Sequence, residues 1–398
     1  MDEAAAQPVE RPAEPARRPC VLHLAVDYPS PNKPDNTVAV RNFVRANRAV
    51  DHVVVALTRT PDPRKVNLLR LEEPGGGRLF AMRYWGLPLG LLHAPSLALA
   101  ARRVLALLRR EGIRVDLVHA HKLFFEGIAG YFVARALGVR LVCSARGEAE
   151  TKALRFLPHY APLFRRMIAY CTRIYYVSAW LRPELERRYP LAAGKGELLP
   201  NICPGEWRSA PQSPPAGRFI SILHVDIWRK KGLGVLLPAF AEHLRSFPHA
   251  TLDIVGRGRP AAFERIAATI DALGLRGRVS LLGALEHEAL AAALPGYGVM
   301  CLPSRNETFG MVYVEALLSG VPAVYSRGTG IDGFLDGIEG AIGVDPRSVR
   351  SVAAGLALAQ REQPRLRAWL VANRALVQAR FDAAQMVAGY NRTLGLVR

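Results

Sequence analysis

The sequence predicts an α/β protein with two Rossmann-like domains, each a doubly wound parallel sheet, facing one another across a cleft. At 398 residues, the chain is about two to three times the length of a typical domain. In both halves, apolar β-type runs alternate with amphipathic helical stretches, which is typical of parallel sheets covered on both faces. A proline-rich segment, residues 200–217, separates the halves and predicts a linker. Ligands of such sheets bind beyond the carboxyl ends of the strands, so the cleft is the expected site.

The first domain is predicted at residues 20–199, after a disordered tail at residues 1–19 that lacks apolar periodicity and a signal-peptide pattern. Its strands are expected at Val21–Val26, Val53–Leu57, Leu117–His119, Val139–Ser144 and Ile174–Val177. Its helices are expected at Thr37–Ala49, Leu97–Arg110, Gly127–Leu137, Phe156–Tyr170 and Ala179–Tyr189.

The second domain is predicted at residues 218–380 and repeats the alternation. Its strands are expected at Phe219–Leu223, Leu252–Val255, Val279–Leu282, Val299–Leu302 and Ala323–Tyr325. Its helices are expected at Leu233–Ser246, Ala261–Leu273, His287–Leu294, Met311–Ser319, Ser348–Gln360 and Arg365–Arg380. A final helix, Asp382–Leu394, lies in a separate C-terminal segment, residues 381–398.

Composition indicates a cytoplasmic protein. The five cysteines are widely spaced without a CxxC pair, which fits a reducing compartment and argues against structural zinc. No segment is long and apolar enough to predict a transmembrane helix. The net charge of +19 is concentrated in the first half, and it indicates either an anionic partner or simply a solvated, arginine-rich surface. Peripheral contact with an anionic inner membrane face is one interpretation; a nucleic-acid partner is not expected, because no recognition motif is found.

The segment Pro303–Gly320 (PSRNETFGMVYVEALLSG) carries the most informative pattern, because it leads from a strand into a helix. Glu307 lies in the loop, and Glu315 follows eight residues later inside the helix. A helix that starts near Gly310 directs free backbone amides at an anion; those amides belong to Phe309, Gly310, Met311 and Val312. Two carboxylates beside a phosphate site suit the hydroxyls of a sugar and of a ribose.

A second pattern, Trp228-Arg229-Lys230-Lys231-Gly232, follows the first strand of the second half. Three cations before a glycine at the end of a strand suit a diphosphate, since lysine supplies a mobile charge and arginine a bidentate fork.

Taken in order along the chain, these features resemble the donor half of retaining glycosyltransferases of family 4, which have the GT-B fold. The resemblance covers roughly residues 218–360 and includes Lys231-Gly232, Ile254–Gly258, Val279–Gly283, Pro303-Ser304, the Glu-x7-Glu pair and Gly320-Val321-Pro322. It implies that Glu307 holds sugar hydroxyls, that Glu315 holds the ribose, and that Lys231 neutralises the diphosphate. It also assigns Gly256, Arg257 and Leu285 to donor binding. Where the family usually has a second phosphate-binding arginine the chain has Val225, so Arg229 or Lys230 is expected to supply that cation.

The N-terminal half resembles the family less closely. His121 ends a His-x-His strand and is expected near the acceptor or the transferred sugar, or simply satisfied at a strand end; metal binding would need more ligands than this pair. Arg146 stands where many relatives have histidine, and would bind phosphate or an acidic acceptor if it faces the cleft. The loop Asp27–Pro34 replaces a Gly-Gly loop, so Asn32 and Lys33 are expected to contribute side chains. The final helix resembles the tail that crosses back onto the N-terminal domain in this fold.

The resemblance therefore implies a metal-independent enzyme without a cofactor. It would transfer a hexose-type sugar from a UDP- or GDP-linked donor, with retention, to a saccharide or lipid-linked acceptor in envelope, exopolysaccharide or glycoconjugate biosynthesis. A sugar-nucleotide epimerase of the same fold and a non-catalytic sugar-nucleotide-binding protein remain alternatives. A dinucleotide oxidoreductase is disfavoured, because Ala261 replaces the third glycine of its motif.

Overall fold

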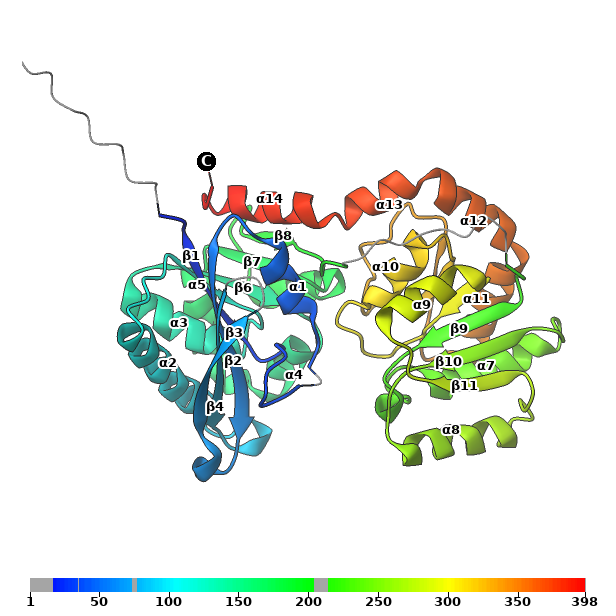
Figure 1. Cartoon of the computed structure of the whole chain (residues 1–398), viewed down its shortest axis with the longest axis horizontal. Coiled ribbons are helices and arrows are strands. Elements are labelled where there is room, and N and C mark those ends of the chain that lie inside the picture. The colour runs from blue at the N-terminus through cyan, green and yellow to red at the C-terminus, as the bar shows by residue number, and fades with distance from the viewer. Residues whose placement is uncertain (1–16, 35, 74–76, 204–213, 398) are drawn as a thin grey trace, which may run out of the picture.

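A computed structural model describes residues 17–34, 36–73, 77–203 and 214–397. Most of the predicted tail and much of the predicted linker lie outside these described residues. The chain forms two α/β domains, each with its own parallel sheet, joined near the top of Figure 1 by the C-terminal helices.

The N-terminal sheet has eight strands in the order β3-β4-β2-β1-β5-β6-β7-β8. They are β1 (Cys20–Ala25), β2 (Asp51–Thr60), β3 (Asn67–Glu73), β4 (Gly77–Trp85), β5 (Leu117–Ala120), β6 (Arg140–Ala145), β7 (Arg173–Tyr176) and β8 (Gly196–Leu198). All neighbours pair in parallel except β3 with β4. The strand order reverses between β1 and β5, so the ligand-binding crevice of this sheet is expected beyond their carboxyl ends.

Helices cover both faces of this sheet (Figure 1). They are α1 (Ala39–Ala46), α2 (His93–Arg110), α3 (Glu126–Leu137), α4 (Glu148–Phe156), α5 (Ala161–Tyr170) and α6 (Arg182–Arg188). The single helix predicted at Phe156–Tyr170 is wrong: α4 ends at Phe156, and α5 begins after a 3-10 turn that starts at Pro158. Proline disfavours the helical conformation in the residue before it, which explains the break. Strands β3, β4 and β8 were not predicted.

The C-terminal sheet has six parallel strands in the order β11-β10-β9-β12-β13-β14. They are β9 (Arg218–Ile222), β10 (Thr251–Val255), β11 (Val279–Gly283), β12 (Val299–Cys301), β13 (Ala323–Ser326) and β14 (Ala341–Val344), of which β14 was not predicted. The helices are α7 (Leu233–Leu244), α8 (Pro260–Ala272), α9 (His287–Ala293), α10 (Met311–Leu318), α11 (Val349–Arg361), α12 (Gln363–Ala372) and α13 (Arg374–Arg380). The order matches the dinucleotide-binding fold, with its switch point between β9 and β12.

The last helix, α14 (Ala383–Thr393), leaves the C-terminal domain and lies against the N-terminal one (Figure 1). Tyr390 is buried in one apolar cluster with Val21 and Phe43. Asn391 and Asn47 exchange two side-chain amide hydrogen bonds of 2.9 Å each. These contacts connect α14 to β1 and α1, so the helix ties the two domains together.

Three further observations bear on the predicted boundaries and environment. Arg17, within the predicted tail, forms an ion pair of 2.6 Å with Asp116, so described structure begins before Cys20. No disulfide joins the cysteines in the described part of the chain. Among the described helices, none combines the length and apolar character needed to cross a bilayer.

Candidate active site

Lys231 and Glu307 meet at the switch point of the C-terminal sheet. Lys231 follows β9, and Glu307 lies in the loop between β12 and α10. The lysine Nζ donates to Oε2 of the glutamate at 2.5 Å, and the two side chains are 18% and 13% exposed. The sequence predicted these two groups in one site, and the structure places them in direct contact.

Gly232 fixes the lysine loop against the loop that carries Glu307. Its φ of +86° is in the left-handed region, and a Cβ at this position would lie 1.9 Å from the carbonyl oxygen of Pro303. The backbone N–H of Arg305 donates to the carbonyl of Lys230 at 3.0 Å. Only glycine allows this close approach, so the two loops form one unit.

A third loop, after β13, holds Glu307 from the other side. The Glu307 N–H donates to Oγ1 of Thr329 at 2.9 Å, and the N–H of Gly330 donates to the Glu307 carbonyl at 3.0 Å. Thr329 and Gly330 were not predicted from the sequence. The available signal was the Gly-Thr-Gly run after the predicted strand Ala323–Tyr325.

The start of α10 lies beside this pair. Gly310 is the N-cap, with a φ of +89°, and the helix begins at Met311, close to the predicted start. The Phe309 side chain is buried, with its ring against Phe334 and Phe381. Phe309 can therefore offer a ligand only its backbone. The first-turn amides from Phe309 to Val312 supply the positive end of the helix dipole.

Glu315 lies in α10 and is 6% exposed, so it is a buried carboxyl and not a charged side chain on the solvent face of the helix. Burial raises the pKa of its carboxyl to about 7. Cys203, in the connector between the domains, approaches it with Sγ 3.9 Å from Oε1. The raised pKa favours the protonated carboxyl more than at an exposed glutamate, and a protonated carboxyl can both donate and accept hydrogen bonds.

The other predicted cations have different partners. Lys230 Nζ donates to Oε2 of Glu148 at 2.5 Å, which links the loop after β9 to the start of α4 in the other domain. Arg229 lies over the ring of Trp228, with 4.8 Å from Cζ to the ring centroid. Lys230 therefore forms a contact between the two domains, whereas Lys231 contacts Glu307 within the C-terminal domain.

The remaining predicted donor-binding residues lie at the same end of the sheet. A Cβ on Gly256 would lie 1.7 Å from the carbonyl oxygen of Leu223, so this glycine permits two strand ends to pack closely. The carbonyl of Arg257 accepts a hydrogen bond of 2.9 Å from the N–H of Val225. Leu285 follows β11 and is 38% exposed.

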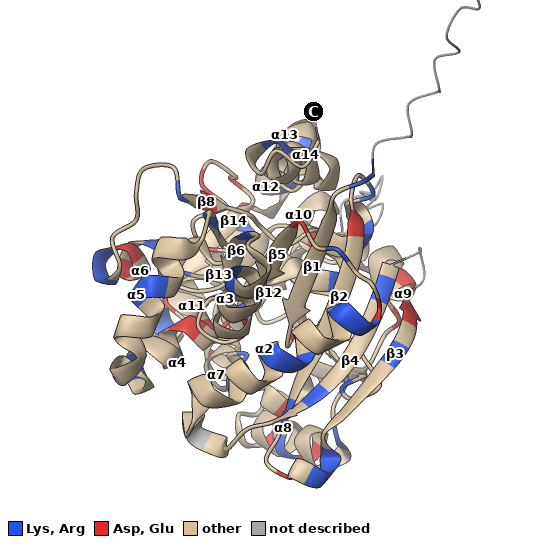
Figure 2. Cartoon of the chain, turned by 90° about the vertical axis from the view of Figure 1, so that its left-hand side faces the viewer, with Lys and Arg blue, Asp and Glu red and all other residues tan. Residues whose placement is uncertain are grey.

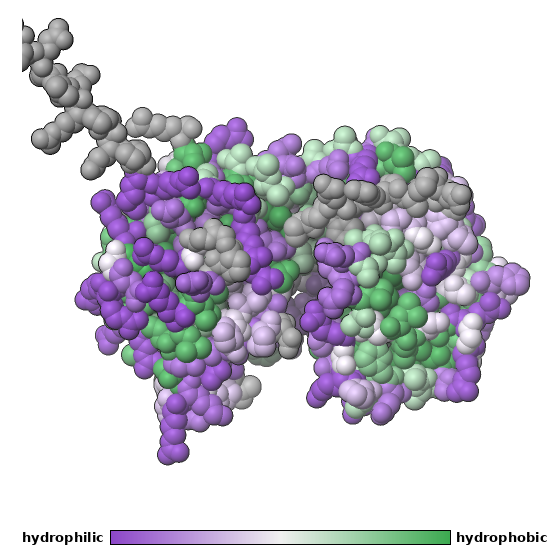
Figure 3. Space-filling model, viewed as in Figure 1, coloured by the Kyte–Doolittle hydropathy of each residue, from purple (hydrophilic) through white to green (hydrophobic). Residues whose placement is uncertain are grey.

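The two domains also touch directly at this edge. Ser178 Oγ, after β7, donates to the carbonyl of Thr308 at 2.5 Å. A Cβ on Gly333 would lie 2.9 Å from Cβ of Ala179. Figure 3 shows a recess between the two domains. Ser178 and Glu148 were not predicted from the sequence, because their contacts depend on the way the domains meet.

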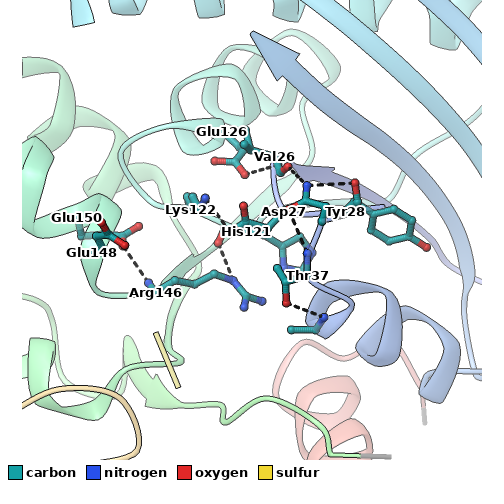
Figure 4. Close-up of polar contacts among 12 residues, drawn as sticks. Val26, Asp27, Tyr28, Thr37, His121, Lys122, Glu126, Arg146, Glu148 and Glu150 are labelled. Carbon is teal, nitrogen blue, oxygen red and sulfur yellow. Dashed lines mark hydrogen bonds and ion pairs between the residues drawn. The ribbon is translucent and has the colours of Figure 1, made fainter. Parts of the chain in front are cut away.

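Arg146 is buried, and three hydrogen bonds hold it to neighbouring residues. Its Nε donates to the carbonyl of His121 at 3.0 Å, and Nη1 donates to Oδ1 of Asn201 at 3.0 Å. Its backbone N–H donates to Oε2 of Glu150 at 3.0 Å. Figure 4 shows the guanidinium extending toward His121. Arg146 thus connects the ends of β5 and β6 to the interdomain connector.

Acidic groups that the sequence did not indicate support the same edge of the N-terminal sheet. Glu126 is fully buried and accepts a hydrogen bond of 2.5 Å from the N–H of Val26, and burial raises its pKa to about 7 (Figure 4). Lys122 forms an ion pair of 2.7 Å with Asp27. These contacts order the loops after β1 and β5.

Asn32 and Lys33, the two residues predicted to contribute side chains from the loop after β1, differ in whether their side chains are held against the sheet or exposed. Asn32 exchanges amide hydrogen bonds of 3.2 and 3.3 Å with Asn67 on β3, which holds the loop against the sheet. Lys33 is exposed, and its backbone pairs with that of Ser30. Of the two side chains, only that of Lys33 extends from the surface.

His121 belongs to a buried histidine cluster that the sequence did not reveal. His23, His119 and His121 offer ring nitrogens that all lie within 4.8 Å of one another. A third potential metal ligand, His23, therefore lies beside the His-x-His pair. However, the rings of His119 and His121 stack with centroids 4.0 Å apart and an interplanar angle of 24°. Ring lone pairs lie in the ring planes, so stacked imidazoles do not converge on one ion.

Both ring nitrogens of His119 have hydrogen-bond partners in the protein, so neither needs a metal ion as a partner. Its Nε2 lies 2.9 Å from Ser144 Oγ, and its Nδ1 lies 3.1 Å from the hydroxyl of Tyr390 on α14. Burial and the nearby Arg146 cation lower its pKa to about 3. The geometry favours a neutral, hydrogen-bonded imidazole.

Comparison with known proteins gives a consistent result. Residues 37–203 match the family model described as Glycosyltransferase Family 4, and residues 218–359 match the model described as Glycosyl transferases group 1. A D-inositol 3-phosphate glycosyltransferase of Segniliparus rotundus is 27% identical over 56% of this chain and 53% of its own length. The chain thus spans about half the length of that relative. An alpha-D-kanosaminyltransferase of Streptomyces kanamyceticus is 25% identical over 88% of this chain and 97% of its own length.

Solved structures agree on the fold. A sucrose-phosphate synthase from Thermosynechococcus elongatus superimposes with a TM-score of 0.73 at 20% identity, covering 96% of this chain and all of that one. This likeness supports the two-domain architecture and the facing sheets.

Proposed function

The chain belongs to the glycosyltransferases of the GT-B fold, with a family 4 domain followed by a group 1 domain, and on this premise we propose the reaction it performs. It transfers a hexose-type sugar from a UDP- or GDP-linked donor to a saccharide or lipid-linked acceptor, with retention of configuration. Its products belong to envelope, exopolysaccharide or glycoconjugate biosynthesis. The observation that carries this proposal is the Lys231–Glu307 pair at the switch point, beside the start of α10.

The chemistry requires stabilisation of a diphosphate leaving group. Negative charge builds on the β-phosphate oxygen as the bond to the sugar breaks, and Lys231 with the α10 amides stabilises that charge. Glu307 next to a diphosphate would be repulsive on its own. The lysine 2.5 Å away offsets this repulsion, so the carboxylate can accept hydrogen bonds from the sugar. Glu315, farther along α10, binds the ribose hydroxyls.

Retention follows if the acceptor attacks from the face that the diphosphate leaves. The departing phosphate oxygen then takes the acceptor proton, and no residue of the chain has to act as nucleophile. Contact between the domains, such as that of Ser178 with Thr308, limits water at the reacting atoms.

A nucleotide-sugar screen tests the function. We expect UDP- or GDP-sugars to raise the unfolding temperature, because a ligand that binds the folded state stabilises it. With an acceptor, the stabilising donor should release nucleoside diphosphate and give a glycoside of unchanged anomeric configuration by NMR. Isomerised sugar without acceptor would identify an epimerase, and tight binding with negligible turnover would identify a non-catalytic binding protein.

We also propose that the N-terminal domain contacts an anionic membrane surface. The apolar face of α2 is core, since Leu97, Val104 and Leu107 are buried. Exposed apolar side chains instead gather beside it. Leu91, Leu92 and Phe156 are 59%, 51% and 63% exposed. A Cβ on Gly90 would lie 2.9 Å from the Leu157 side chain, which places the two segments together.

Basic residues are also present on α2, α5 and α6 of the same domain (Figure 2), and Arg102, Arg103, Arg165 and Arg166 among them are exposed. We expect the protein to sediment with phosphatidylglycerol vesicles at low salt but not with phosphatidylcholine vesicles. Leu91→Ser combined with Phe156→Ser should reduce sedimentation while the unfolding temperature stays near that of the wild type. Equal sedimentation of the double variant and the wild type would show that charge alone drives binding to the vesicles. No sedimentation of the wild type would exclude the membrane contact.

A further inference from the structure

Three imidazoles form a hydrogen-bonded row across β2, β1 and β5. His52 Nδ1 lies 2.9 Å from His23 Nε2, and His23 Nδ1 lies 3.0 Å from His121 Nε2. At the outer end, His52 Nε2 lies 2.5 Å from the backbone carbonyl of Asn47. The row thus runs from a fixed backbone group to the end of β5, beside the candidate active site.

The carbonyl at one end sets the direction of every hydrogen bond in the row. A carbonyl oxygen only accepts, so His52 must carry its proton on Nε2. A neutral imidazole has one N–H, so Nδ1 of His52 is an acceptor and His23 must donate to it from Nε2. With its proton on Nε2, His23 has a bare Nδ1 that can only accept. His121 therefore donates from Nε2 to His23 Nδ1.

These proton positions hold for neutral rings, and the surroundings of the three histidines favour the neutral form. Burial lowers the pKa of His23 and His121 well below 6.5, and it also lowers the pKa of His52. The Arg146 cation and the neighbouring histidines lower the pKa of His121 further.

The row leaves one ring nitrogen for another partner. His121 Nδ1 is buried and has no hydrogen-bond partner among the described residues. His121 lines a cavity of about 10 Å³ together with Arg146, Asn201 and Phe43. That volume holds about one water molecule or hydroxyl group. A lone pair on Nδ1 would make this nitrogen an acceptor for a hydroxyl.

We propose that His23 and His52 are positioning residues that hold His121 as its Nε2–H tautomer, so that Nδ1 accepts a hydrogen bond from a substrate hydroxyl. This role rests on the proposed function, but the tautomer does not. The row ends on a carbonyl oxygen that cannot take up a proton, so it does not carry protons out of the site. Its effect is to fix the tautomer and orientation of one ring.

The tautomer can be measured without any substrate. In protein labelled with [15N]histidine, long-range 1H–15N spectra distinguish the protonated ring nitrogen from the bare one. We expect His121, His23 and His52 each to be neutral with the proton on Nε2. Each signal is assigned by substitution of that histidine, and His159→Asn, which changes an exposed histidine, serves as the control. A His121 proton on Nδ1, or a charged ring, overturns the proposal.

Two substitutions of the outermost histidine test the mechanism. His52→Asn keeps an acceptor oxygen close to the position of Nδ1, whereas His52→Leu removes the acceptor and allows the row to invert. We expect His52→Leu to shift the His121 proton toward Nδ1 and to lower kcat about tenfold or more, as loss of an orienting partner does for a functional histidine. His52→Asn should keep the tautomer and most of the activity.

These readouts separate the role from simple structural support. If His52→Leu unfolds, the wild-type and His52→Asn spectra still decide the tautomer. An unchanged His121 tautomer in folded His52→Leu overturns the proposal. If no donor sugar is ever transferred, the proposed function fails, while the spectra still show whether the row fixes His121.

Discussion

Replacing Lys231 with alanine is expected to lower kcat by about 100- to 1000-fold, the usual cost of losing one preorganised group that stabilises developing negative charge. Two effects combine here. In the proposed site, the diphosphate loses a stabilising cation, and Glu307 loses the partner whose Nζ lies 2.5 Å from its carboxylate. The unpaired carboxylate then repels the same phosphate that the lysine attracted. Steady-state kinetics with the donor identified by the nucleotide-sugar screen measures the change.

The adjacent lysine provides a matched control. Lys230→Ala removes an equal charge one residue away, but Lys230 pairs with Glu148 across the domain boundary. We expect it to affect kcat much less than Lys231→Ala does. Equal losses in the two variants would show that only the net charge of the loop matters. Turnover near wild type in folded Lys231→Ala would remove the lysine from the site.

A double-mutant cycle measures how strongly Lys231 and Glu307 depend on one another in their effect on kcat. Glu307→Gln should itself be strongly impaired, because the sugar loses a charged acceptor. In the Lys231→Ala background, however, Glu307→Gln should cost less than it does alone, because the repulsive charge is then absent. Side chains in contact are coupled in this way, whereas distant ones are additive.

The sequence predicted the parts of this site that are local along the chain. The Lys-Gly pair after β9 and the two glutamates around the start of α10 are set by strand, loop and helix order, and the spacing of residues revealed them. Thr329, Ser178 and Glu148 reach the site from other loops. Their roles depend on which loops meet in space, and spacing along the chain does not contain that information.

The row formed by His52, His23 and His121 likewise could not be predicted from residue spacing. His23 lies within an apolar run, Val21–Val26, that predicts a buried strand without indicating a polar partner. The structure pairs His23 with His119 in the register of β1 and β5. Those strands lie far apart in the sequence, and their adjacency follows from the reversal of strand order. The unpredicted strands β3 and β4 extend the sheet on the opposite side, away from this reversal.

Gly232→Ala is expected to lower the stability of the folded protein strongly. The left-handed conformation at φ +86° and ψ 3° costs an alanine about 1–2 kcal/mol. The added Cβ would also lie 1.9 Å from the Pro303 carbonyl oxygen and 2.5 Å from its carbon, so the backbone must move. Together these effects should lower the free energy of unfolding by about 3 kcal/mol or more. Chemical denaturation followed by circular dichroism measures the loss.

Gly234→Ala is the matched control, two residues away in the first turn of α7. The nearest group to its added Cβ is the Trp228 ring at 3.8 Å, and alanine favours the helical conformation. We expect Gly234→Ala to be neutral or to stabilise the protein by up to about 1 kcal/mol.

The turnover of the Gly232→Ala variant then tests whether the close packing of the two loops at Gly232 is needed for activity. Since Gly232 sets the backbone beside Lys231, Gly232→Ala protein that remains folded at low temperature should still lose most of its turnover, because the lysine is displaced from Glu307. Full turnover in that folded variant would mean that the two loops need not pack against one another, and that Lys231 reaches the diphosphate from more than one backbone position.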